Sequence, residues 1–162
     1  MVLLFSCRQK NLSEVEVIKF NPEVIHELKK TSDTSFTEYV GRSDFYNIDH
    51  YINYKDSVTT QIFKDSIGNV VAYTKTKADK VFFAIEYYAN GQAKGKLPDK
   101  SNGKYNGQAR YYFEDGRVSS EGLFKNGLWC GKWKNYDKAG HLISIDDYGE
   151  GSPNPIKTIK IK

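Results

Sequence analysis

The segments YYANG (87–91), YYFEDG (111–116) and NYDKAG (135–140) repeat one pattern, in which aromatic residues precede a turn that ends in glycine. The closing glycine returns after 25 and then 24 residues, and SNGKYNG (101–107) recurs as KNGLWCG (125–131). A fainter copy, FKDSIG, ends at Gly68. A constant interval of this size is typical of repeat proteins, in which each unit buries its apolar face by stacking on its neighbours. The sequence therefore predicts a repeat architecture.

The repeats have the turn and strand composition of antiparallel β-hairpins. Asn90-Gly91 and Asp115-Gly116 are dipeptides favoured in type I′ turns, because both central residues take positive φ. We expect hairpin tips there, and expect Asn102-Gly103, Asn106-Gly107 and Asn126-Gly127 to join successive hairpins. The strands between them are rich in aromatic and β-branched residues, in KVFFAIEYY (80–88), QARYYF (108–113), RVSSEGLF (117–124), LWCGKWKNY (128–136) and HLISIDDY (141–148).

These features predict a mainly β fold, with stacked antiparallel hairpins over 58–148 that form an elongated sheet. Alternation along 128–136 predicts Trp129, Gly131 and Trp133 on one face of the sheet. The other face would carry the intervening residues, among them Cys130 and Tyr136. Aromatic side chains are therefore expected on both faces of a thin sheet.

The run NGKYNGQARYYFEDGRV (102–118), with GLFKNGLWCGKWKNYDKAGHL (122–142), resembles the variant form of the MORN (membrane occupation and recognition nexus) repeat. The resemblance covers 84–148 and, more faintly, 58–76. LPDKSNG (97–103) departs from the pattern, as does Ala139, so we expect the first repeat to be irregular. Variant MORN repeats of this type occur in bacterial antitoxin and immunity proteins. The resemblance thus implies a toxin-neutralising role for this chain.

Residues 8–57 do not match the repeat and are expected to form a small α+β cap on the first hairpin. VEVIKF (15–20) alternates like a strand, and EVIHELKK (23–30) after Asn21-Pro22 reads as a short helix. In SDFYNIDHYINYKDS (43–57), aromatic side chains are interleaved with acidic ones. This segment is either a protein-binding surface, since tyrosine is enriched at binding hot spots, or a loop whose rings pack on the sheet. Its aromatic residues are Phe45, Tyr46, Tyr51 and Tyr54.

The first seven residues, MVLLFSC, resemble the end of a bacterial lipoprotein signal, which would make Cys7 a lipidation site. That reading implies a lipid-anchored protein of the bacterial cell envelope. The segment lacks the basic start and the full apolar stretch of a secretory signal, so the alternative is a strand end in a cytoplasmic protein. Cys130 is the other cysteine and is expected to be a small strand residue. A Cys7–Cys130 disulfide is the alternative if Cys7 carries no lipid.

Residues 1–80 have no net charge and residues 81–155 contribute +1, so the remaining +3 of the net charge of +4 comes from Lys157, Lys160 and Lys162 in the C-terminal tail, residues 149–162. Residues 81–155 carry 10 basic and 9 acidic side chains, which does not suggest the basic stripe that nucleic-acid binding needs. In IKTIKIK (156–162), lysine alternates with apolar residues as in an edge strand, where lysine discourages further pairing. We therefore expect no nucleic-acid partner, and contact with a membrane only through a lipid on Cys7.

The sequence contains no motif for catalysis, metal binding or cofactor binding. His26, His50 and His141 lie far apart, and neighbours such as Asp49-His50 and Asp146-Asp147 have the acid-base groups without the spacing of a known site. A hydrolase would require Asp and His from separate repeats to converge. From the sequence we predict a non-enzyme without metal or cofactor.

The leading functional prediction is a module that binds a protein partner, with a toxin as the specific expectation. Besides the acidic 43–57 segment, Tyr87, Tyr112 and Tyr136 recur at the repeat interval and would line up on neighbouring hairpins. These rings would form either an exposed binding ridge or the core of the sheet. The alternative function is a membrane-associated structural module, which would need a basic face to bind anionic lipid.

Overall fold

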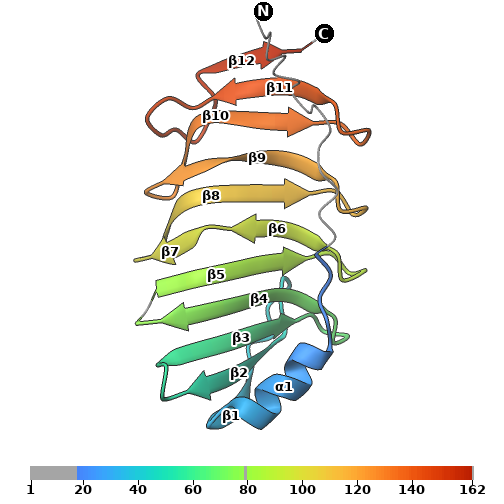
Figure 1. Cartoon of the computed structure of the whole chain (residues 1–162), viewed down its shortest axis with the longest axis vertical. Coiled ribbons are helices and arrows are strands. Elements are labelled where there is room, and N and C mark those ends of the chain that lie inside the picture. The colour runs from blue at the N-terminus through green and yellow to red at the C-terminus, as the bar shows by residue number, and fades with distance from the viewer. Residues whose placement is uncertain (1–17, 79, 162) are drawn as a thin grey trace, which may run out of the picture.

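The computed structural model describes residues 18–78 and 80–161, which form one antiparallel sheet of twelve strands with one short helix. The strands follow one another in chain order, as Figure 1 shows, except that β7 pairs beside the path with β5 and β8. The predicted mainly β fold is therefore confirmed. The elements are α1 (Glu23–Thr31), β1 (Thr34–Tyr39), β2 (Asn47–Asn53), β3 (Val58–Lys64), β4 (Val70–Lys77), β5 (Lys80–Tyr87), β6 (Ala93–Leu97), β7 (Asp99–Ser101), β8 (Lys104–Tyr112), β9 (Val118–Lys125), β10 (Leu128–Tyr136), β11 (Leu142–Asp147) and β12 (Lys157–Lys160).

Four hairpins have the predicted tips at Gly68, Gly91, Gly116 and Gly140, but the two predicted to be type I′ turns, at Gly91 and Gly116, are of another type. At the third tip, the amide of Gly116 donates to the carbonyl of Phe113 (2.9 Å), and the amide of Phe113 donates to the carbonyl of Arg117 (2.8 Å). Only the glycine has positive φ at each tip, 86° for Gly116, so Asn90 and Asp115 are not left-handed. These tips are type I turns closed by a left-handed glycine, which adds one unpaired residue to the following strand.

The type I′ geometry occurs at the opposite ends of the strands. Asn102 and Gly103 have φ of 48° and 74°, and Asn126 and Gly127 have 53° and 81°. The predicted connection at Asn106-Gly107 is wrong, because both residues lie within β8. The irregular first repeat has a visible cause: β6 and β7 flank Pro98, whose missing N–H interrupts the ladder.

The tips are also bonded to one another along one edge of the sheet. The hydroxyl of Tyr88 donates to the carbonyl of Tyr112 (2.7 Å), and the side-chain amide of Asn90 donates to the carbonyl of Glu114 (3.3 Å). Both bonds join residues 24 apart. Equivalent positions of successive repeats therefore stack at the tips as well as in the strands.

The sheet has hydrophobic clusters on its two opposite faces. The first includes Ile85, Tyr87, Tyr112 and Val118, with Phe20 packed against it, and the second includes Ala109, Phe124, Trp133 and Tyr148. Cross-strand pairing and alternation place Tyr87, Tyr112 and Tyr136 together on what we call the tyrosine face. Trp129 and Trp133 lie on the other, the tryptophan face, with their rings stacked 5.2 Å apart. The predicted separation of aromatic side chains between two faces is thus confirmed.

The segment before the repeats, predicted to form a small α+β cap on the first hairpin, pairs with that hairpin and continues the sheet. It contributes β1 and β2, while α1 contacts β2. Lys19 pairs with Gln92 beside the second hairpin tip, and the ring of Phe20 packs edge-on against Tyr87 at 5.5 Å. At the other end, the tail predicted to be an edge strand forms β12. Cys7 lies outside the described residues.

Candidate functional site

Three of the tyrosines predicted to contact a partner are buried. The exposed fractions are 3% for Tyr51, 7% for Tyr87 and 1% for Tyr112. Tyr136 is half-buried, and its hydroxyl donates to Glu121 Oε1 at 2.9 Å. The row at the repeat interval is therefore part of the core, because a single sheet has few other large side chains to bury. Of the two alternatives that the sequence left open for Tyr87, Tyr112 and Tyr136, an exposed ridge or the core of the sheet, the burial of these rings supports the core.

Phe45, Tyr46 and Tyr54, the other predicted contact residues, lie in or beside loops next to β2. The Phe45 ring packs edge-on against Phe63 at 5.2 Å, with the Arg42 guanidinium 5.0 Å from its centre, and is half-buried. Tyr46 and Tyr54 are 38% and 64% exposed. Of the seven predicted residues, these two keep the most surface for a partner.

Two further exposed rings on β1 join Tyr46 and Tyr54. Phe36 is 50% exposed and stacks on His50 with 4.5 Å between ring centres, and Tyr39 is 75% exposed and packs edge-on against Tyr46 at 5.6 Å. Sequence reasoning missed both, although the β-rich run TSFTEY (34–39) was the available signal. We call the group of Phe36, Tyr39, Tyr46 and Tyr54 the aromatic edge.

The aromatic edge coincides with the end of the sheet. β1 pairs only with β2, so its other side presents backbone amides and carbonyls without a strand partner among the described residues. Its six residues include no lysine, arginine or proline, the residues that usually discourage a further strand. β12 at the opposite end has Lys157 and Lys160 at its two ends. The two ends of the sheet are therefore chemically different.

Acid and histidine side chains meet at the same end, on both faces of the sheet. His50 Nε2 lies 3.0 Å from Glu38 Oε2, and its Nδ1 lies 3.5 Å from the amide nitrogen of Gln61. Asp49, the neighbour of His50, points to the other face and pairs with Lys64. Burial works to raise the pKa of Asp49, but the hydrogen bonds from Lys64 and Thr37 outweigh burial and hold that pKa below its usual value. Asp49 and His50 therefore do not act as one acid-base pair.

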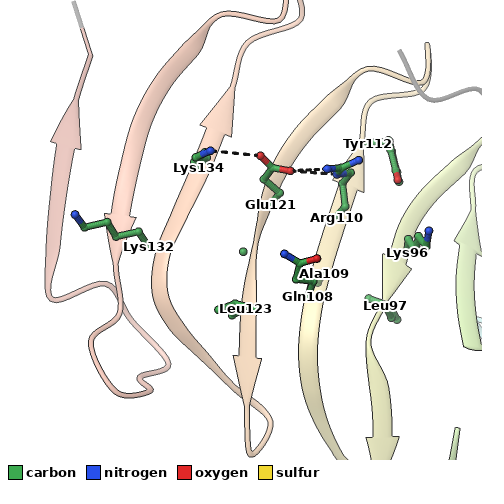
Figure 2. Close-up of a pocket in the computed structure, with 11 residues that line it drawn as sticks. Lys96, Leu97, Gln108, Ala109, Arg110, Tyr112, Glu121, Leu123, Lys132 and Lys134 are labelled. Atoms are coloured by element: carbon green, nitrogen blue, oxygen red, sulfur yellow. Dashed lines mark hydrogen bonds and ion pairs between the residues drawn. The ribbon is translucent and has the colours of Figure 1, made fainter. Parts of the chain in front are cut away.

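A charged groove crosses the tyrosine face farther along the sheet. Its volume is about 470 Å³, and its walls come from β6, β8, β9 and β10. Figure 2 shows Glu121 between Arg110 and Lys134. Arg110 donates to Glu121 Oε2 from Nε (3.1 Å) and Nη2 (2.9 Å), while Lys134 Nζ lies 3.8 Å from Oε1. Burial and the hydrogen bond to Glu121 raise the pKa of Tyr136 to about 12.

A second hollow, of about 680 Å³, lies near the middle of the sheet, and its lining includes Phe45, Phe63, Glu86 and Tyr105. The ammonium of Lys100 lies 5.1 Å from the centre of the Tyr105 ring, a cation–π contact. Burial, followed by the charge of Glu86, raises the pKa of the nearby Tyr111 to about 12. Its described lining combines aromatic and aliphatic side chains with a few charged ones, and it does not include Asp49, His50, Asp146 or Asp147.

The structure also shows where the acidic pair Asp146-Asp147 and the cysteine Cys130 lie. Asp146 and Asp147 point to opposite faces, pairing across the sheet with Thr158 and Lys157 respectively. Cys130 is a free, half-buried thiol. Within 18–78 and 80–161, no three His, Cys, Asp or Glu side chains gather as a metal site would require. No helix in that same part of the chain is long and apolar enough to cross a membrane.

Comparison with known proteins adds little to this geometry. No protein-family model matches the chain, and no curated protein matches it. Among solved structures, the crystal structure of TarM has a TM-score of 0.40 and 10% sequence identity, and the match covers 88% of this chain. A substituted S. aureus TarM in complex with fondaparinux, α-GlcNAc-glycerol and UDP has the same TM-score and 11% identity. This chain spans only 24% of the length of either.

This comparison corrects the sequence-based prediction of a non-enzyme. TarM is a glycosyltransferase, so the structures that resemble this chain are those of an enzyme, and the prediction is not kept. At a TM-score of 0.40 the likeness assigns no reaction to this chain. The MORN resemblance stays a prediction from the repeated residues.

Proposed function

We propose that this chain binds a protein partner through the aromatic edge. The observation that carries the proposal is the coincidence, at one end of the sheet, of four exposed aromatic rings with a strand whose outer side has no strand partner among the described residues. Tyrosine and phenylalanine rings supply a large contact area at low entropic cost, and they are enriched where proteins bind one another. An open strand adds backbone hydrogen bonds, as in complexes where a partner extends a sheet.

The opposite end of the sheet is a poorer candidate for the same role. It also exposes apolar side chains, Ile156, Ile159 and Ile161, at 71%, 41% and 43%. Its strand is flanked by Lys157 and Lys160, which a partner strand would have to desolvate. The difference favours β1 as the docking end.

Two narrower parts of the proposal rest on the sequence alone. The resemblance to variant MORN repeats makes a bacterial toxin the first class of partner to test. The lipoprotein-like start makes Cys7 the expected anchor to the cell envelope. Co-expression with a toxin encoded beside this gene would test the first, since a neutralising protein should restore growth. Mass spectrometry of the mature N-terminus would test the second.

Site-specific crosslinking tests the docking surface directly. A photoreactive phenylalanine analogue at position 39 should crosslink to the partner in the source cell, because Tyr39 is 75% exposed in the aromatic edge. The matched control carries the same analogue at position 82, since Phe82 is 41% exposed but lies in β5. Equal crosslinking at both positions, or crosslinking at position 82 alone, would contradict the proposal.

A second measurement separates contact from stability. Tyr39→Ala and Tyr54→Ala remove mostly exposed rings, so the thermal unfolding temperature should change little. Affinity for the crosslinked partner should fall about tenfold or more if these rings are hot spots. Unchanged affinity in the double variant would remove the aromatic edge as the binding site.

A further inference from the structure

Several basic side chains on the second half of the sheet lie together on the tyrosine face. The nearly equal numbers of acidic and basic residues over 81–155 do not indicate this arrangement. The registers of β6, β8, β9 and β10 align Lys96, Arg110, Glu121 and Lys134 as successive cross-strand partners. Lys132 lies two residues before Lys134 and so points to the same face. The groove lining therefore contains four cationic groups and one carboxylate.

The carboxylate of the described lining, that of Glu121, already has hydrogen-bond and ion-pair partners. Glu121 accepts two bonds from Arg110 and one from the Tyr136 hydroxyl, and Lys134 lies at its far oxygen. Lys96 and Lys132 are exposed and form no ion pair with any residue that the structure describes. The described lining of the groove therefore keeps an excess of positive charge, although the register of β10 and β11 places Asp147 opposite Lys132.

The dimensions of the groove suit a short length of chain. Neighbouring strands lie about 4.8 Å apart, so the row from Lys96 to Lys134 extends roughly 14 Å across three strand spacings. Successive side chains on one side of an extended peptide are about 7 Å apart. Two carboxylates of such a peptide can therefore approach the two ends of the row. Leu123, 45% exposed in the groove lining, offers an apolar contact between them.

The same lining disfavours a nucleic acid. Binding of single strands combines basic groups with aromatic rings on which bases stack. Among the described residues that line the groove, Tyr112 is the only aromatic one, and it is 1% exposed. Glu121, in the middle of the row, would also repel a continuous phosphate backbone. Charge and contact chemistry therefore favour an acidic peptide.

We infer that the groove on the tyrosine face binds an acidic peptide segment, with Lys96, Lys132 and Lys134 facing its carboxylates and Leu123 contacting an apolar side chain. This site lies on different strands from the aromatic edge and does not depend on it. Charge attraction makes the binding sensitive to salt, because the Debye length falls as the ionic strength rises and is about 10 Å at 0.1 M. The apolar contact with Leu123 contributes to the affinity in a way that added salt does not weaken.

Two adjacent lysines provide the matched test. Lys96→Glu reverses a charge inside the groove, whereas Lys94→Glu reverses the charge of another exposed lysine, which lines the other hollow. Binding of the full chain to a fluorescent ten-residue peptide of glutamates with one central leucine is measured by fluorescence anisotropy. We expect Lys96→Glu to weaken binding about tenfold and Lys94→Glu to weaken it less than about twofold. Glu121→Gln should strengthen binding, because it removes the only carboxylate among the lining residues that the structure describes.

Three outcomes would overturn the inference. The first is the absence of saturable binding at low salt, and the second is an equal loss in Lys94→Glu and Lys96→Glu. The third is tighter binding of a ten-residue oligothymidine than of the acidic peptide, which would assign the groove to nucleic acid. A peptide in which glutamine replaces glutamate reports the apolar contribution and should bind far more weakly. Circular dichroism of each variant confirms that it remains folded.

Discussion

The indole ring of Trp133 lies directly over Gly122, so that a Cβ built on Gly122 would sit 2.3 Å from the ring. The two residues occupy neighbouring strands, β9 and β10, on the tryptophan face. The ring is held in place from its other side, because it stacks on Trp129 and its Nε1 donates to the carbonyl of Leu123 at 3.1 Å. Glycine at 122 is required here by the space the ring takes up.

Gly122→Ala should therefore lower the free energy of unfolding by about 3 kcal/mol, the upper part of the range for overpacking. Urea denaturation followed by tryptophan fluorescence measures the change. Trp133→Leu should itself destabilise the protein, but adding Gly122→Ala to it should cost far less than adding it to the parent. Additive losses in the double variant would show that the ring does not press on position 122.

Gly116→Val should destabilise the third hairpin because Gly116 has a φ of 86°, which a β-branched residue adopts only with strain. We expect a loss of about 1–2 kcal/mol or more, measured by chemical denaturation. Asp115→Asn is the matched control, because asparagine keeps the side-chain oxygen that accepts the amide of Arg117 at 2.9 Å. A midpoint for Gly116→Val equal to that of Asp115→Asn would contradict the turn assignment.

Two asparagines at the ends of β2 should respond oppositely to the same substitution. The side-chain oxygen of Asn47 is buried and has no hydrogen-bond partner among the described residues, whereas that of Asn53 accepts the amide of Asp56 at 3.2 Å. Asn47→Val should leave stability unchanged or raise it, since an unsatisfied polar group is removed and valine favours strands. Asn53→Val should lower stability by about 1 kcal/mol. Thermal unfolding of the two variants, side by side, decides the comparison.

Three tyrosines should titrate well above the others in the folded protein. The pKa of Tyr87, Tyr111 and Tyr136 is raised to about 12, and burial is the largest cause of the rise in each case. Between pH 10 and 12 the unfolded chain loses these protons while the folded chain keeps them, so stability is full below pH 10 and falls as pH rises through that window. Ultraviolet absorbance of the phenolate form measures the titration.

Tyr136→Phe serves as the control for that experiment, because it removes one late-titrating group and the bond to Glu121. Its alkaline loss of stability should be shallower than that of the parent protein. A single titration step near pH 10 for all twelve tyrosines would show that none of the three is held as the structure places it.

Turn chemistry and periodicity predicted the sheet well, but they did not predict turn type. Glycine at 68, 91, 116 and 140 located each tip, and alternation placed Trp129 and Trp133 on one face. The error at Asn90-Gly91 and Asp115-Gly116 arose because a glycine preceded by Asn or Asp also ends a type I turn, where only the glycine is left-handed. Such dipeptides therefore indicate a tip and leave its geometry open.

The candidate surfaces were harder to predict from the sequence. Which side chains are exposed, and which charges share a face, depends on which strands pair and in which register. Tyr112 and Tyr39 are the same residue type in similar strand contexts, yet one is 1% and the other 75% exposed. Their difference arises from what covers each face and from which strand lies at the end. The row from Lys96 to Lys134 likewise depends on the register between strands. Counting the charges in the sequence gives no information on that register.

Pairing between Lys19 and Gln92 has a consequence for the order in which the molecule assembles. Most strands pair with the strand that precedes or follows them in the chain, so each hairpin closes only a short loop and can form early. The contact of residues 18–20 with the tip near Gly91 closes a much longer loop, which costs more chain entropy. It must also wait until that hairpin exists. The segment leading into α1 is therefore expected to dock last, after the hairpins of the sheet have formed, and to hold the N-terminal part of the chain against the tip near Gly91.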